Sequence, residues 1–240
     1  MKPTLILLPG LMCDITAWQP LLPGLTEIAH CQVADHGMAD SLSQMARQVL
    51  DQAPERFALA GHSMGGRVAL ELMRISPERV THLGLFDTGH LPLPAGSAGQ
   101  AEIAKRMGLL ALARSHGVRA MAAEWVQDMV APDRLHDGPL IESILDMIER
   151  KSADVLERQL RALIQRPDAT DVLRQLRCPT LLLCGELDSA APPSQHQAMA
   201  DEIPARPGVA SLPGCGHMAM QEQPDVVLRQ MRDWLATPIS

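Results

Sequence analysis

Residues 57–66 of the chain read FALAGHSMGG, and this stretch decides the fold. The apolar run at 57–60 predicts a short buried strand, and a helical stretch follows the glycines. Ser63 lies between Gly61 and Gly65, on a turn where neighbouring backbone leaves no room for larger side chains at those two positions. The turn therefore exposes the Ser63 hydroxyl at the end of a strand, beside a helix N-terminus that favours negative charge.

The pattern G-x-S-x-G between a strand and a helix is typical of a nucleophile elbow. A serine hydroxyl is a poor nucleophile until a base accepts its proton, and a carboxylate must orient that base. We therefore expect Ser63 to be a catalytic nucleophile. A glycine-rich turn that arose by chance would account for the five residues but not for the strand and helix around them.

His217 is the expected base among nine histidines. It follows the last apolar run on a glycine-rich loop, at the edge where open α/β sheets place their sites. His62 adjoins Ser63 but should point elsewhere from the turn. His90 follows a strand and is a possible substrate contact. The histidines interpreted as surface or packing residues are His30, His82, His116, His136 and His196.

Two aspartates compete to orient His217, and both follow a predicted strand. Asp188 ends the segment LLLCGELD at 181–188, and Asp87 ends the segment LFD at 85–87. We favour Asp188, with Asp87 as the rival. If Asp188 is the acid, Asp87 would support the loop that leaves the sheet.

An oxyanion formed during acyl transfer needs backbone N–H groups that are fixed in advance. Met64, the residue after the nucleophile, should supply one donor. Leu11 should supply the other, because it follows Pro9-Gly10 in the loop after the first strand. Pro9-Gly10 by itself would also fit an ordinary turn.

Short apolar runs alternate with helical stretches in both outer parts of the chain, which predicts a mainly parallel sheet with helices on both faces. The predicted strands are 4–8, 31–34, 57–60, 80–86, 180–184 and 209–212. The predicted helices are 41–52, 67–75 and 224–236.

The middle of the chain differs from its flanks. Residues 88–177 carry 12 basic and 12 acidic residues, so the net charge of -7 comes from the rest of the chain. Apolar residues recur there at helical spacing with no strand between them. We therefore expect a helical cap at 88–177, inserted into a core formed by 1–87 and 178–240.

Composition excludes several classes of protein. The net charge of -7 repels nucleic acid, and no run of 18 apolar residues predicts a membrane-spanning helix. Five cysteines without paired metal spacing fit free thiols in a reducing compartment, so the expected location is the cytoplasm. The chain has 14 methionines but no tyrosine, which excludes any mechanism that needs a catalytic tyrosine.

On these motifs the sequence resembles the α/β-hydrolase superfamily, in particular its small capped esterase-like members. The resemblance covers roughly 3–87 and 178–236, and the chain order Ser63, Asp188, His217 matches it. It implies a cofactor-independent serine hydrolase with no metal. The first strand begins only at the third residue, so we expect about six strands, and Pro9 replaces a frequent histidine that braces its loop. Epoxide hydrolases and dehalogenases of the superfamily are excluded by Ser63 and, for the former, by the lack of tyrosine.

The leading hypothesis is hydrolysis of a small carboxylic ester or lactone through an acyl-enzyme. Acyl transfer or cofactor-free perhydrolysis on the same residues is the alternative, and a non-catalytic ligand-binding protein of this fold is a third. The substrate would contact His90 and the cap residues Met121, Trp125 and Met129, although the cap residues could equally pack helices together. The sequence does not indicate an oligomeric state.

Overall fold

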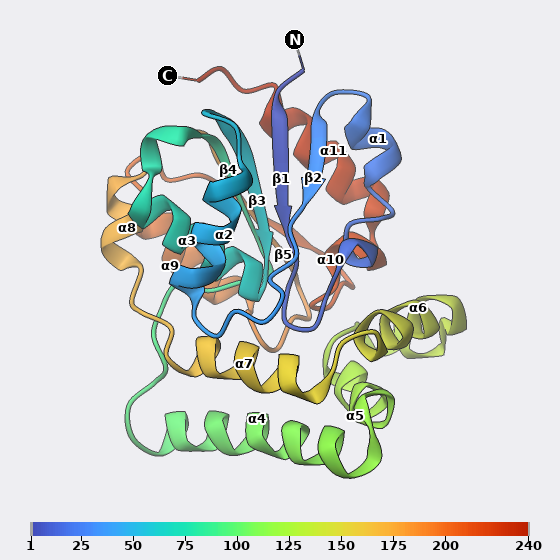
Figure 1. The fold of residues 1–240 in the computed structure, drawn as a ribbon. Coiled ribbons are helices and arrows are strands. Elements are labelled where there is room, and N and C mark those ends of the chain that lie inside the picture. Colours follow the sequence, from blue (N-terminus) through green and yellow to red (C-terminus); the bar gives the residue numbers. More distant parts are fainter. Residues whose placement is uncertain (1, 240) are drawn as a thin grey trace.

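The computed structural model describes residues 2–239, and its centre is a six-stranded sheet in which each pair of neighbouring strands is parallel. The strand order is β2-β1-β3-β4-β5-β6 (Figure 1). The strands are β1 (Thr4–Leu8), β2 (His30–Val33), β3 (Phe57–His62), β4 (Val80–Phe86), β5 (Thr180–Gly185) and β6 (Val209–Leu212). This confirms the predicted α/β fold with a sheet of about six strands.

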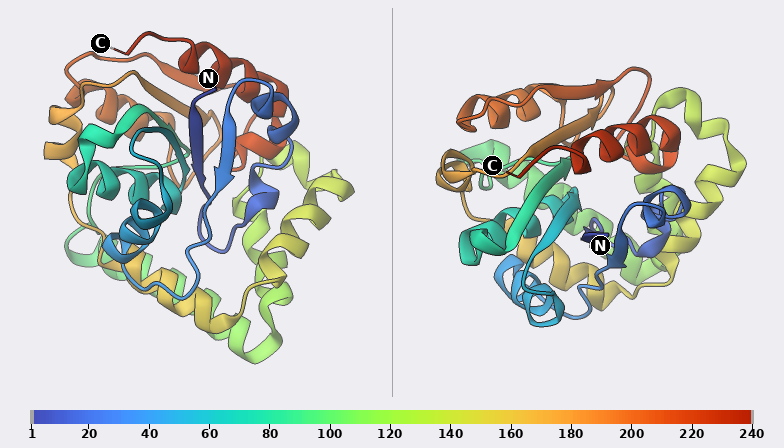
Figure 2. Two further views of the ribbon diagram at one scale, coloured as in Figure 1. Left: turned by 45° about the horizontal axis from the view of Figure 1, so that its top comes forward. Right: turned by 90° about the horizontal axis from the view of Figure 1, so that it is seen from above.

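Helices cover both faces of the sheet. On one face α2 (Leu42–Gln52), α3 (Met64–Ile75), α8 (Thr170–Gln175) and α9 (Pro193–Glu202) pack side by side. On the other face α1 (Leu22–Thr26) contacts α11 (Pro224–Leu235), as the view from above in Figure 2 shows. The short helix α10 (Ala219–Glu222) precedes α11. The inner strands β1, β3, β4 and β5 are therefore largely buried, whereas the edge strands β2 and β6 stay partly exposed.

Local chemistry sets several helix ends. The Ser41 side chain accepts a hydrogen bond from Gln44 N and begins α2, whose predicted range is confirmed. Helix α3 begins at Met64, three residues before the range predicted from its apolar pattern, because the turn at Ser63 leads directly into helical backbone.

Four further helices lie beyond the carboxyl ends of the strands (Figure 1). They are α4 (Gly96–His116), α5 (Val118–Trp125), α6 (Gly138–Glu149) and α7 (Ala153–Ile164), with the 3₁₀ turns η3 (Val126–Asp128) and η4 (Pro132–His136) between them. The other 3₁₀ turns are η1 (Ile15–Ala17) and η2 (Pro77–Arg79). Helix α8 also falls within 88–177, but it contacts α3 and α9 beside the sheet. The division into core and cap at 88 and 177 stays a prediction.

The core is built mainly from leucine, alanine and methionine. One of its few ring contacts joins Trp18 and Phe86, whose ring centroids lie 5.5 Å apart in an edge-to-face arrangement. No helix within residues 2–239 has both the length and the apolar character needed to cross a membrane.

Candidate active site

The turn at Ser63 is strained and tightly enclosed. Ser63 has a φ of 53°, a backbone conformation that residues other than glycine rarely adopt. Its N–H donates to Phe86 O at 2.9 Å, and Thr88 Oγ1 donates to its carbonyl oxygen at 2.7 Å. A Cβ on Gly65 would lie 2.2 Å from Leu8 O, so the strand and helix approach closely only because that position is glycine. The surrounding hydrogen bonds hold the strained turn in place.

Ser63, His217 and Asp188 come together at the carboxyl edge of the sheet. His217 Nε2 lies 2.9 Å from Ser63 Oγ, and His217 Nδ1 lies 2.8 Å from Asp188 Oδ2. The other oxygen of Asp188 accepts from Ala190 N at 2.8 Å and Ala191 N at 3.0 Å. The carboxylate is therefore fixed on one side by backbone and orients the imidazole on the other.

The electrostatics of the pair favour a charged carboxylate beside a basic imidazole. Burial alone would raise the pKa of Asp188, but His217 and the N–H groups of Ala190 and Ala191 lower it to about 2. Burial alone would lower the pKa of His217, but Asp188, together with the more distant carboxylates of Asp87 and Glu222, raises it above its ordinary value. A raised pKa makes His217 a stronger base toward the Ser63 hydroxyl.

Asp87, the rival acid, has a different role in this geometry. Its Oδ1 accepts from Gly185 N at 2.9 Å, so it joins the ends of β4 and β5 instead of contacting the imidazole nitrogen. Complete burial raises the pKa of Asp87 well above its ordinary value. The choice of Asp188 over Asp87 agrees with the distances.

The loop after β1 lies next to Ser63. Leu11 and Met64 line the same cavity as Ser63 and His217, where their N–H groups were expected to face an oxyanion. Pro9 lacks the bracing histidine side chain of many superfamily members, but His36 Nε2 donates to Pro9 O at 3.1 Å and braces the loop from the next strand connection.

Two buried side chains that the sequence analysis did not assign to the site hold the loops around it. Gln159 on α7 accepts a hydrogen bond from Met12 N at 2.8 Å and so ties the helical layer to the loop that carries Leu11. Oε1 of Glu222 accepts hydrogen bonds from Gly216 N at 3.0 Å and Met218 N at 3.1 Å, and Oε2 accepts one from Ala131 N at 2.9 Å. Gln159 lies 147 residues from Met12 and Glu222 lies 91 residues from Ala131, so local sequence patterns did not reveal these contacts.

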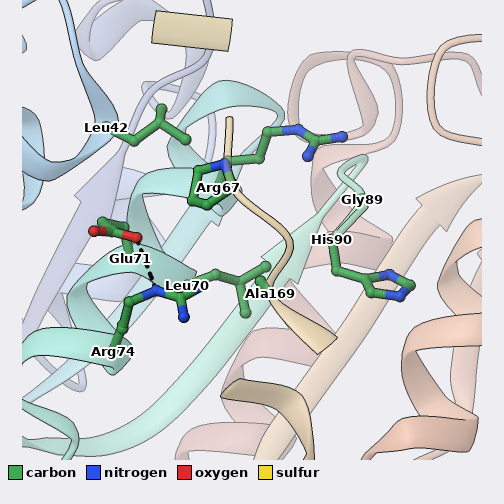
Figure 3. Close-up of a pocket in the computed structure, with 9 residues that line it drawn as sticks. Leu42, Arg67, Leu70, Glu71, Arg74, Gly89, His90 and Ala169 are labelled. Atoms are coloured by element: carbon green, nitrogen blue, oxygen red, sulfur yellow. Dashed lines mark hydrogen bonds and ion pairs between the residues drawn. The ribbon is translucent and has the colours of Figure 1, made fainter. Parts of the chain in front are cut away.

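A cavity of about 430 Å³ opens over Ser63 and His217, beneath the helical layer. Of the four predicted substrate contacts, Trp125 and Met129 line it. His90 and Met121 do not. His90 is buried and is one of the residues that line a separate small pocket between α3 and residues 167–169 (Figure 3), and Met121 is wholly buried among the helices. A contact of these two residues with substrate stays a prediction, which the lining of this cavity does not support.

A family model described as the alpha/beta hydrolase family matches residues 5–230, nearly the whole chain. The chain belongs to the alpha/beta hydrolase family. This confirms the family that the motifs predicted.

Several individual proteins are similar to this hydrolase. It is 31% identical over 89% of its length to the dihydrolipoyllysine-residue acetyltransferase component of an acetoin cleaving system from Pseudomonas putida, but it spans only 54% of that relative. It is 25% identical to a pimeloyl-[acyl-carrier protein] methyl ester esterase from Nitrosomonas europaea, covering 93% of this chain and 92% of the relative.

Solved structures are similar over the whole chain. An esterase from Thermogutta terrifontis, with malate bound, has a TM-score of 0.82 and 27% identity, covering 98% of this chain and 90% of that one. The enol-lactonase from Burkholderia xenovorans has a TM-score of 0.85 at 20% identity, covering 99% and 92% respectively, which supports the fold alone.

Proposed function

We propose that this protein is a serine hydrolase that cleaves small carboxylic esters or lactones through an acyl-enzyme. One observation carries the proposal: the array Ser63 Oγ, His217 Nε2, His217 Nδ1 and Asp188 Oδ2, with separations of 2.9 and 2.8 Å, lies at the floor of a cavity of substrate size. Relatives named as esterases support carboxylic ester hydrolysis as the reaction class.

In the proposed mechanism, Ser63 Oγ attacks the ester carbonyl carbon while His217 Nε2 accepts the hydroxyl proton. The N–H groups of Leu11 and Met64 stabilise the negative charge on the carbonyl oxygen, aided by the N-terminus of α3. The intermediate collapses as His217 returns the proton to the leaving alcohol. Water then attacks the acyl-enzyme while His217 accepts its proton, and His217 returns that proton to Ser63 Oγ as the acid product leaves. Asp188 stabilises the imidazolium each time it forms.

The decisive experiment uses a fluorophosphonate probe followed by mass analysis of peptides. We expect a single adduct on Ser63 in the wild-type protein and none in Ser63→Ala. The same variant should lose about 10⁴-fold or more in kcat/KM toward ester substrates, because the acyl-enzyme can no longer form. An unlabelled Ser63 in folded wild-type protein, or an active Ser63→Ala variant, would overturn the proposal.

Acyl transfer to an acceptor other than water is the second candidate, and the name of the P. putida acetyltransferase relative favours it. Product analysis with and without an alcohol or peroxide acceptor separates it from hydrolysis.

The five cysteines are all unpaired in the structure, which supports a reducing compartment such as the cytoplasm.

A further inference from the structure

Three arginines line the cavity beside Ser63, and only two of them are paired with a carboxylate, that of Glu102. Arg166 pairs with Glu102 through both oxygens, at 2.7 and 3.0 Å, and Arg106 contacts the same carboxylate at 2.7 Å. Arg67 lines the same cavity, and within residues 2–239 it makes no ion pair. We call Arg67, Arg106, Arg166 and Glu102 the arginine cluster.

The other charged groups that line the cavity do not balance this excess. Lys105 pairs with Asp128 at 2.7 Å, so these two charges cancel. Asp87 also lines the cavity, but its Oδ1 is bound to Gly185 N and burial raises its pKa well above the ordinary value. The arginine cluster therefore retains about two positive charges in the wall of a cavity that belongs to a chain of net charge -7.

Arg67 is the member best placed to meet a ligand. Its one side-chain hydrogen bond among the described residues runs from Nη1 to Leu91 O at 2.8 Å, which leaves most guanidinium N–H groups without a protein acceptor. Arg166 Nε donates to the same Leu91 oxygen at 3.3 Å, so the two cations are held close together. Figure 3 shows the Arg67 side chain extending away from Glu71 and Arg74, on the side of Gly89.

Charge repulsion confirms that the arrangement is unfavourable without an anion. Burial, followed by the neighbouring positive charges of Arg166 and Arg106, lowers the pKa of Arg67 to about 9, and Glu102 offsets only part of this effect. An anion beside Arg67 would favour its charged form and relieve this repulsion.

The arginine cluster is also fixed relative to the nucleophile. Arg67 follows Ser63 by four residues on α3, which is about one helical turn. Leu91, Leu109, Leu160 and Leu163 also line the cavity. The cavity thus combines a hydrolytic group, aliphatic side chains and a group of arginines.

From this geometry we infer that the substrate is an ester that carries a free carboxylate on its non-reacting part, held by Arg67 with help from Arg106 and Arg166. Guanidinium forks match a carboxylate through two parallel hydrogen bonds, as Arg166 already does with Glu102. The inference rests on the proposed role of Ser63, because it names the substrate class of that same site.

The test compares esters that differ only in the distal charge. In the first pair, monomethyl adipate carries a carboxylate on the acyl side and dimethyl adipate is its neutral counterpart. In the second pair, 3-acetoxypropionate carries a carboxylate on the alcohol side and propyl acetate is its neutral counterpart. We expect the wild-type enzyme to have the higher kcat/KM for the anionic member of at least one pair. Arg67→Met should reduce that anionic-to-neutral ratio about tenfold to a hundredfold, because a hydrogen-bonded charge is lost. Arg67→Lys, which keeps the charge but loses the fork, should fall between.

Arg174→Met is the matched control, since Arg174 is an exposed arginine on α8 that pairs with Asp171 and Glu202 away from the cavity. It should leave the ratio unchanged. Arg106→Met replaces Arg67→Met if the latter fails to fold. No anionic preference in the wild type, or a preference that survives Arg67→Met, overturns the inference.

Binding to an inactive protein separates the subsite from the catalytic proposal. Adipate should bind to Ser63→Ala in calorimetry, and the double variant with Arg67→Met should bind it at least about tenfold more weakly. Adipate binding without hydrolysis of any ester would leave the subsite standing and overturn the proposed function. Hydrolysis of neutral esters without adipate binding would do the opposite.

Discussion

The loops at the carboxyl edge of the sheet and the helices α4 to α7 face the same cavity, but they are held in different ways. The edge loops are held by buried groups that each satisfy several backbone atoms, as Asp188 and Glu222 do. The helical layer is held at its surface by exposed ion pairs such as Arg114 with Glu157. Breaking a buried arrangement leaves unsatisfied polar groups, whereas breaking a surface pair leaves groups that water can solvate.

This difference suggests a division of labour. Atoms that carry out the proposed reaction lie on loops where small displacements are costly. Apart from Arg67 on α3, the residues proposed to contact the substrate belong to the helical layer and its connections, where exposed ion pairs should tolerate change. The following variants are ordered from the largest expected effect to the smallest, and each tests one side of the comparison or the joint between them.

Replacing the acid at the edge should have the largest effect. In Asp188→Asn the imidazole loses the carboxylate that orients it, so kcat/KM should fall about 10³-fold to 10⁴-fold. Asp87→Asn keeps an oxygen for Gly185 N and should lose less than about tenfold. Equal losses in the two variants would contradict the assignment of Asp188.

The pH profile of the same variant tests the electrostatics. In the wild type, kcat/KM should fall as the pH decreases through a pKa above the ordinary histidine value, since protonated His217 cannot accept a proton. Removing the Asp188 charge lowers the pKa of His217, so the acid limb measured for the residual activity of Asp188→Asn should move to lower pH. An unmoved limb would assign it to another group.

Glu222→Gln tests how strongly the edge depends on one buried carboxylate. The amide has a single acceptor oxygen for three N–H donors, so we expect a loss of about 2 to 4 kcal/mol in the free energy of unfolding. Chemical denaturation measures it. A loss below about 0.5 kcal/mol would show that the loop is held by other contacts.

Gln159→Leu breaks the joint between the two regions. Met12 N would lose its buried acceptor, at a cost of about 1 to 3 kcal/mol in the free energy of unfolding. Because Met12 adjoins the expected oxyanion donor Leu11, kcat should fall more than KM rises. Gln159→Glu keeps an acceptor oxygen and serves as the comparison. Unchanged kcat in Gln159→Leu would separate the loop geometry from the helical layer.

Arg114→Met should have the smallest effect. It removes an exposed ion pair between α4 and α7, which is expected to contribute less than about 1 kcal/mol. Thermal unfolding should shift by no more than a few degrees, with kcat/KM unchanged. A larger change would mean that the surface pairs, and not the buried contacts, fix the helical layer.

The strands and the positions of Ser63, His217 and Asp188 followed from local sequence. Apolar runs, glycines that only a tight turn requires, and acidic or histidine residues directly after strands are all local patterns, and parallel strands bring their carboxyl ends to one edge. The predicted start of α3 lies three residues after the observed start at Met64, because the glycines in its first turn carry no apolar periodicity.

Only the tertiary structure decides which residues line the cavity over Ser63. His90 and Met121 satisfied the same local rules as Trp125 and Met129, yet only the latter pair lines the cavity. Gln159 and the arginine cluster gave no local signal, because Met12 lies far from Gln159 in the chain and the three arginines come from three separate segments.

The sequence by itself determined the fold, the place of Ser63 on its turn and its chain order with His217 and Asp188, since each depends on a short run of residues and on the regular geometry of a parallel sheet. Only the tertiary structure decided that Arg67, Arg106 and Arg166 line one cavity beside Ser63, where Glu102 pairs with the last two. Their positions in the chain span 99 residues, and the packing of α4 and α7 over the sheet brings them together. Charge balance in a cavity is a sum over every side chain that lines it, and the linear sequence does not contain that sum.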